Sequence, residues 1–168
     1  VDSAFGGDIR ARLEFQDGGL LTGQVPVRVA GTFLKTGFIV QAEAVASQTG
    51  GEIQVRTDKP ATMEKSISPW DDKGHTLTWT VELPAAGEYQ LAVRYCTPGA
   101  VQRKRSLNER EIGVVTFPGT GGFGTQAHEW EHVRFEPVAL PKGTATIRLE
   151  NSDGKGLNLD YLALVPVK

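Results

Sequence analysis

Two segments in the middle of the chain alternate large apolar and polar residues with a period of two. The alternation runs through TLTWTVEL (76–83) and again through EYQLAVRY (88–95). This period sends successive side chains to opposite faces of a strand, whereas a helix needs an apolar residue every three or four positions. Between the two segments, Pro84 and Gly87 suit the dihedral angles of a tight corner. The pattern therefore predicts two half-buried antiparallel strands.

Glycine and proline divide the rest of the chain into short segments of the same kind. The sequence holds 20 Gly and 9 Pro, and no segment keeps a convincing helical period. Many short strands separated by turns predict an all-β fold, an antiparallel β-sandwich of jelly-roll type. The further strand candidates are 9–15, 25–30, 38–44, 52–56, 106–115, 131–138, 144–150 and 157–165.

Two parts of the chain are expected to differ in role. Residues 38–168 hold most of the strand candidates and are predicted to form the sandwich. Residues 1–37 contain two alternating segments and are joined to the rest through GTFLKTG. We expect them to be an N-terminal β-hairpin extension or a linker from a preceding domain.

Charge, apolar content and cysteine use exclude several classes of function. A net charge of -2 and a pI of about 5.9 give no general attraction to nucleic acid or to an anionic membrane. No apolar run approaches the ~20 residues that span a bilayer, and the first residues lack the features of a signal peptide. Cys96 is the only cysteine, which excludes an internal disulfide and a cysteine-based zinc cluster. We expect Cys96 to be a small core residue.

The segment HEWEH (128–132) matches the H-E-x-x-H signature of zinc proteases. That signature requires a helix, on which two histidines four positions apart share one face. The glycines upstream disfavour a helix, and Val133 and Phe135 alternate with charged residues downstream. The only other histidine is His75, in a predicted turn. An ordinary polar strand is therefore expected, and no catalytic residue is assigned.

Five phrases in the same order resemble carbohydrate-binding modules of the family 6 and family 35 type. They are IVQAEA (39–44), AAGEYQLAVRY (85–95), TGGFGTQAHEW (120–130), LPKGTATIRL (140–149) and GLNLDYLAL (156–164). The resemblance covers about 130 residues, from position 38 onward. It implies a jelly-roll sandwich with a structural calcium ion and a sugar site in the loops at one end. It also implies attachment to a secreted polysaccharide-degrading enzyme.

The resemblance places the calcium ion on Gln41, Glu43 and Asp160. The sequence pattern gives a second, independent argument for a cation. Strand parity puts Asp160 on the same side as Leu162 and Leu164, which are expected to face the core. A carboxylate that points inward is costly without a partner, and a cation would remove that cost. Calcium accepts oxygen ligands, so a glutamine carbonyl is permitted, although it lowers the charge of the site. The alternative is that Asp160 pairs with an arginine or caps a turn.

Flat aromatic faces and polar planar groups are the features that recognise a sugar. Trp79 shares the parity of the apolar residues of its strand, so we assign it to the core. Trp130 has the opposite parity to Val133 and Phe135 and is expected to face outward, and Trp70 lies in a polar turn. The resemblance points to Trp70, Phe123 and Asn158 as sugar contacts, with Trp130 as the other candidate for the loop aromatic.

The basic run VQRKRS (101–106) is expected to be a loop near the same end. Arg103 or Arg105 could grip the carboxylate of an acidic (uronic acid) sugar with two hydrogen bonds, and a solvated basic loop is the alternative. The adjacent Asp71 and Asp72 are read as solvated loop carboxylates rather than as an acid/base pair.

The resulting hypothesis is a non-catalytic, calcium-stabilised module that binds an oligo- or polysaccharide, either an acidic (uronic acid) sugar or a sugar of a plant or algal cell wall. It would tether a covalently linked, secreted catalytic domain to that glycan. The alternative hypothesis is a structural or adhesion sandwich that packs on its parent enzyme without binding sugar.

Overall fold

The computed structural model describes residues 9–14, 20–25 and 36–167, and the chain divides into two compact units, Val1–Thr36 and Gly37–Lys168. In the first unit, β1 (Ile9–Glu14) pairs antiparallel with β2 (Leu20–Val25). The strand predicted from residue 9 is therefore present as β1. The segment predicted at 25–30 lies almost wholly outside the described residues.

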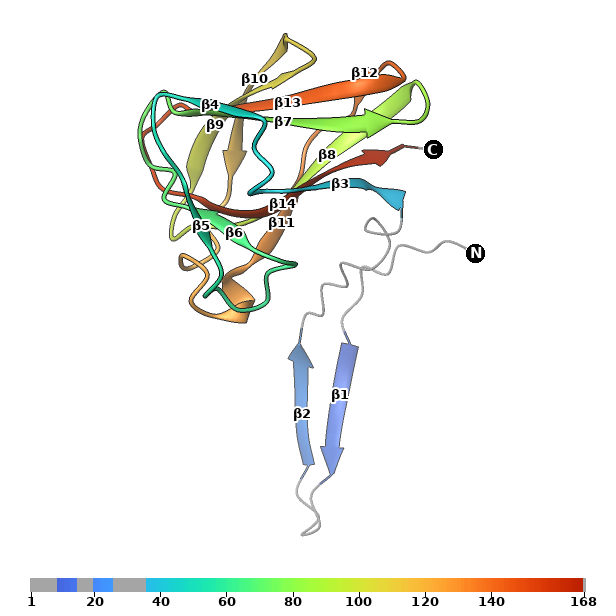
Figure 1. The fold of residues 1–168 in the computed structure, drawn as a ribbon. Helices are drawn as coiled ribbons and strands as arrows, with labels where there is room; N and C mark the ends of the chain where they lie inside the picture. Colours follow the sequence, from blue (N-terminus) through green and yellow to red (C-terminus); the bar gives the residue numbers. More distant parts are fainter. Residues whose placement is uncertain (1–8, 15–19, 26–35, 168) are drawn as a thin grey trace. The chain divides into compact units, whose positions relative to one another are not determined.

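The second unit consists of two antiparallel sheets that face each other (Figure 1). Across the five-stranded sheet the order is β10 (Arg110–Phe117), β9 (Val101–Leu107), β13 (Gly143–Asn151), β7 (Thr76–Leu83) and β4 (Ser47–Thr49). Across the seven-stranded sheet it is β11 (Glu131–Arg134), β8 (Gly87–Cys96), β14 (Asn158–Pro166), β6 (Ser66–Ser68) and β5 (Gln54–Arg56). Two further strands complete this sheet, β12 (Val138–Leu140) beside β8 and β3 (Phe38–Gln41) beside β14.

The chain crosses from one sheet to the other between β7 and β8, between β8 and β9, and between β13 and β14. These crossings between the two sheets are typical of a jelly roll. The predicted all-β antiparallel sandwich is confirmed. No helix in the described part of the chain is long and apolar enough to cross a membrane.

The core lies between the two sheets and is built from the alternating positions of the long strands. Trp79 is fully buried in it, as expected, and its indole nitrogen donates a hydrogen bond to the Ala42 carbonyl at 2.9 Å. Tyr95, Phe117 and Phe135 add a chain of edge-to-face ring contacts, with ring centres 5.0 and 5.3 Å apart. Burying each large aromatic contributes roughly 1.5–3 kcal/mol.

The basic run 101–106 is a strand, so the prediction of a loop there is wrong. It forms most of β9, and the single strand predicted at 106–115 is in fact the β9–β10 hairpin. Its turn is made by Asn108 and Glu109, both in the left-handed region at φ 48° and 64°. Alternate residues of β9 point into the sandwich, which buries Arg103 and Arg105.

The HEWEH segment does not form the helix that a zinc protease needs. Its first residues belong to a single 3-10 turn, η1 (Ala127–Glu129), and the backbone is already extended at Trp130. His132 lies on β11, where its Nε2 is 2.6 Å from the Tyr161 hydroxyl. His128 and His132 therefore do not share a helical face. This confirms the prediction that the segment does not form the helix of a zinc protease.

Candidate functional site

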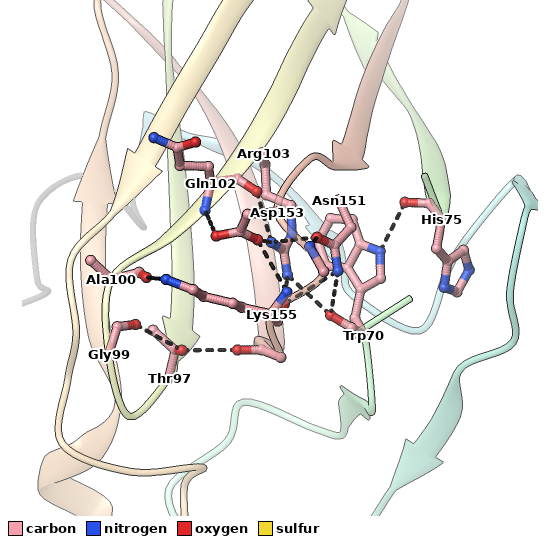
Figure 2. A network of polar contacts seen from close by, with 12 residues as sticks. Trp70, His75, Thr97, Gly99, Ala100, Gln102, Arg103, Asn151, Asp153 and Lys155 are labelled. Carbon is pink, nitrogen blue, oxygen red and sulfur yellow. Dashed lines mark hydrogen bonds and ion pairs between the residues drawn. The ribbon is translucent and has the colours of Figure 1, made fainter. Parts of the chain in front are cut away.

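The Arg103 side chain, predicted to contact sugar, is instead the centre of a buried polar network (Figure 2). Its Nη1 donates to the Gln102 carbonyl at 2.8 Å and to side-chain oxygens of Asn151 and Asp153 at 3.2 Å. Its Nη2 donates to the carbonyls of Trp70 at 3.0 Å and Lys155 at 2.8 Å. Burial lowers the pKa of Arg103 to about 10, and Asp153 opposes that shift. The expectation that Arg103 grips a uronate is wrong, because both of its terminal nitrogens are used internally.

Arg105, the other arginine considered for a uronate, is also buried. Its guanidinium lies 5.1 Å from the ring centre of Phe135, between the sheets. Burial lowers its pKa, an effect that nearby Glu136 opposes. Arg105 therefore faces the core and not a ligand in the loops.

Trp70 belongs to the core, so the expectation that it is an exposed turn residue is wrong. It is fully buried, its indole nitrogen donates to the His75 carbonyl at 3.1 Å, and its ring meets that of Trp79 edge to face at 6.5 Å. Arg103 covers the ring from β9, 33 positions away in the sequence. Local periodicity cannot reveal such a contact, which is why the turn was read as solvated.

Trp130 lies on the sheet face that points away from the core, as its parity predicts, but it is buried there rather than exposed. It lies against Arg94, whose side chain belongs to the face of β8 that points away from the core. The glycine-rich loop covers it: a Cβ added at Gly124 would lie 2.6 Å from the Trp130 ring. Gly124 has φ +74°, which a glycine adopts without strain. Trp130 is therefore sealed under a loop and presents little surface to a ligand.

Phe123 and Asn158 do come together at the loop end of the sandwich. The Phe123 side chain is 43% exposed, and the Asn158 amide donates to the Phe123 carbonyl at 2.9 Å. Both line a pocket of about 360 Å³, within the roughly 300–1,000 Å³ of small-molecule sites. We call this the first pocket. Its other polar lining residues are Arg56, Lys59, Ser68 and Asp71.

The sequence analysis missed the two basic residues of the first pocket, Arg56 at the end of β5 and Lys59 in the β5–β6 loop. Arg56 is held by Asp58 through two hydrogen bonds of 2.8 and 2.6 Å, an interaction that lowers the pKa of Asp58 to about 2. Within residues 36–167, no ion pair occupies the Lys59 ammonium. Lys59 is thus a cation in this pocket with capacity to bind a ligand, opposite in sign to Asp71.

The residues expected to bind calcium lie on β14 and in and just after β3, the strand that pairs with it. Asp160 is fully buried and accepts hydrogen bonds from the Met63 amide, at 2.9 Å, and from the Arg94 guanidinium. Burial raises the pKa of Asp160, and the hydrogen bonds from Met63 and Arg94 oppose that shift. The arginine partner considered as the alternative is therefore present.

Two side-chain oxygens at the end of β3 have no partner in the described structure. They are Oε1 of Gln41 and Oε2 of Glu43, and both are buried. Buried oxygens are normally satisfied, and uncharged or anionic oxygens are the ligands that calcium prefers. The residues present therefore fit a calcium ion, which would compensate Gln41 and Glu43 while Arg94 keeps its contact with Asp160.

The fold is similar to that of carbohydrate-binding modules of known structure. No protein-family model matches the chain. It is similar to a family 35 carbohydrate-binding module from Clostridium thermocellum, with 22% identity, a TM-score of 0.66 and coverage of 79% of this chain and 99% of that one. It is also similar to a family 6 module from Cellvibrio mixtus lichenase 5A in complex with cellotriose, with 22% identity, a TM-score of 0.59 and coverage of 77% and 97%. These are the families that the sequence resembles.

Similar folds also occur within larger enzymes. The Podospora anserina GH26-CBM35 β-(1,4)-mannanase matches with 22% identity and a TM-score of 0.65, over 79% of this chain and 28% of that one. Mannan endo-1,4-beta-mannosidase A of Piromyces sp is 30% identical over 89 residues, which are 52% of this chain. The chain spans 14% of the length of that relative.

Proposed function

We propose that this protein is a non-catalytic carbohydrate-binding module whose glycan site is the first pocket. The observation that carries the proposal is the exposed ring of Phe123, set over a pocket with polar groups from Asn158, Lys59 and Asp71. An aromatic face suits the C–H side of a sugar ring, and the polar groups can bond its hydroxyls. The similarity to family 35 and family 6 modules supports the same assignment.

The protein acts by proximity rather than by chemistry. As a module in a longer secreted enzyme, it keeps a linked catalytic domain close to polysaccharide and raises the effective concentration of the two partners. The match to mannan-degrading enzymes, over a small share of their length, supports such an arrangement. If the glycan carries a uronate, Lys59, which lines the pocket, is the residue that binds its carboxylate in place of Arg103.

A calcium ion has a structural role in this proposal. Gln41, Glu43 and Asp160 would hold it, with no part in sugar contact. Bound calcium would compensate the buried oxygens beside β14 and thereby stabilise the folded state.

The test is a binding screen by affinity gel electrophoresis and calorimetry against mannan, β-glucan, α-glucan and polyuronate. We expect retention on at least one of these, and loss of about tenfold or more in affinity for Phe123→Ala. Val114→Ala is the matched control, because Val114 is also exposed, at 58%, but lies on β10 outside the pocket. No retention on any of the four would favour the structural or adhesion sandwich instead.

A further inference from the structure

A second pocket lies directly beside the first. It has a volume of about 330 Å³ and is lined by the segment that joins β8 to β9, including Pro98, Gly99 and Ala100. Lys155, from the β13–β14 loop, lines it as well. This pocket is about as large as the first, so each can hold a ligand unit of similar size.

The two pockets share two lining residues, Phe123 and Gly156. A Cβ added at Gly156 would lie 3.1 and 3.2 Å from two atoms of the Phe123 ring, so the ring rests on the bare glycine backbone. Phe123 therefore forms a common wall, and its exposed part borders both cavities. A single ligand that contacts this ring can extend to either side of it.

The walls of the second pocket are fixed by hydrogen bonds that Figure 2 shows in part. The Thr97 hydroxyl bonds to the carbonyls of Gly99, at 3.1 Å, and Gly156, at 2.9 Å, and so links the two loops. Lys155 reaches across to the Ala100 carbonyl at 3.4 Å, and its own carbonyl is held by Arg103. Because the walls are tied together, the second pocket is a preformed site.

The two pockets differ in chemistry. Apolar residues line both pockets, but the first also has four charged or amide side chains, those of Arg56, Lys59, Asp71 and Asn158, whereas Lys155 is the one such side chain among the described residues that line the second. Polar groups select among sugars by their hydroxyl patterns, while an apolar surface accepts the C–H face of many sugars. The first pocket is suited to recognise one unit, and the second to hold its neighbour with less discrimination.

We propose that the site binds a linear glycan across Phe123, with one sugar unit in the first pocket and the adjoining unit in the second. This inference rests on the proposed function and adds to it a minimum length, two contiguous units. Affinity then rises from one unit to two or three and does not rise further.

The experiment is calorimetric titration with β-1,4-manno-, cello- and isomalto-oligosaccharides of one to four units. The substitution Gly99→Trp places a large ring on a residue that lines the second pocket, at a position where a Cβ meets no atom within 4 Å. We expect wild-type affinity to rise about tenfold or more from one unit to two or three. In Gly99→Trp the affinity for one sugar unit should be unchanged, and the increase of affinity with oligosaccharide length should be lost. Ala100→Phe is a second blocking variant, and Val114→Trp is the control that should keep the rise.

Equal affinity for all lengths, or a rise that survives both blocking variants, would overturn the two-pocket inference and leave the sugar site in place. If the wild type binds none of these oligosaccharides and no polysaccharide of the wider screen, the proposed function itself fails. The two failures are therefore distinct.

Discussion

The Arg103 guanidinium lies 4.4 Å from the ring centre of Trp70 and donates a 3.0 Å hydrogen bond to the Trp70 carbonyl. Both residues were predicted to touch a sugar, and they touch each other instead. The contact joins the β6–β7 segment to β9, and the same guanidinium holds the β13–β14 loop through Asn151, Asp153 and Lys155. Arg103 thereby positions the backbone that borders both pockets.

Replacing Arg103 with methionine should therefore cost stability. The change removes one of the two donors to each of the Trp70 and Lys155 carbonyls, which keep their bonds from the Asn151 amide, and it takes the cation away from Asp153. Breaking a buried ion pair of this kind costs about 3–5 kcal/mol. Urea denaturation measures the free energy of unfolding. Lys104→Met, on the same strand as Arg103, removes a more exposed ion pair with Glu111 of β10 and should cost much less. Equal losses in the two variants would contradict the role given to Arg103.

Calcium should raise the thermal midpoint of the wild type, and chelation should lower it. A ligand at 100 times its Kd stabilises by about 2.7 kcal/mol. Glu43→Gln should reduce the effect, and Gln41→Glu should tighten binding because it adds a charge to the ligand set. Differential scanning fluorimetry in calcium and in chelator gives the readout, with Glu52→Gln, an exposed position, as the control. A midpoint that does not respond to calcium in any variant would remove calcium from the proposal.

His75 should make stability depend on pH. It is fully buried, burial lowers its pKa, Asp72 and Asp71 oppose that shift, and Arg103 supports it. The unfolded chain binds a proton near the ordinary pKa of about 6.5, whereas the folded chain binds one only at lower pH. Stability is thus fully present above that value and falls as the pH decreases through it. Denaturation midpoints between about pH 5 and 8 should show this slope, and His75→Gln should flatten it. An unchanged slope in the variant would assign the effect to other groups.

Cys96 should be unreactive in the folded protein. It is buried, and desolvation raises the pKa of its thiol to about 12, so the thiolate that reacts is scarce at neutral pH. A thiol reagent should label Cys96 only after denaturation. Fast labelling of the native protein would show that the Gly124 loop opens, because Gly124 packs against the Cys96 sulfur.

The fold was predictable because it depends on a local signal. Strand alternation in 76–83 and 88–95 needs only neighbouring residues to be read, and it matched β7 and β8 closely. The same rule assigned Trp79 to the core. It failed at 101–106, where alternate arginines replace the apolar residues that mark an inward face. Arginine is read as exposed unless its partners are known, and those partners lie about 50 positions away.

The sequence alone determined which segments are strands, that they form an antiparallel sandwich, and that Phe123 and Asn158 are candidates for one site. Only the tertiary structure decided which aromatic ring is exposed. Trp70 is closed off by Arg103 and Trp130 by the Gly124 loop, while Phe123 rests on Gly156 and remains 43% exposed. The reason is that alternation tells which side of a strand a residue occupies, whereas exposure depends on what a distant segment lays over that side.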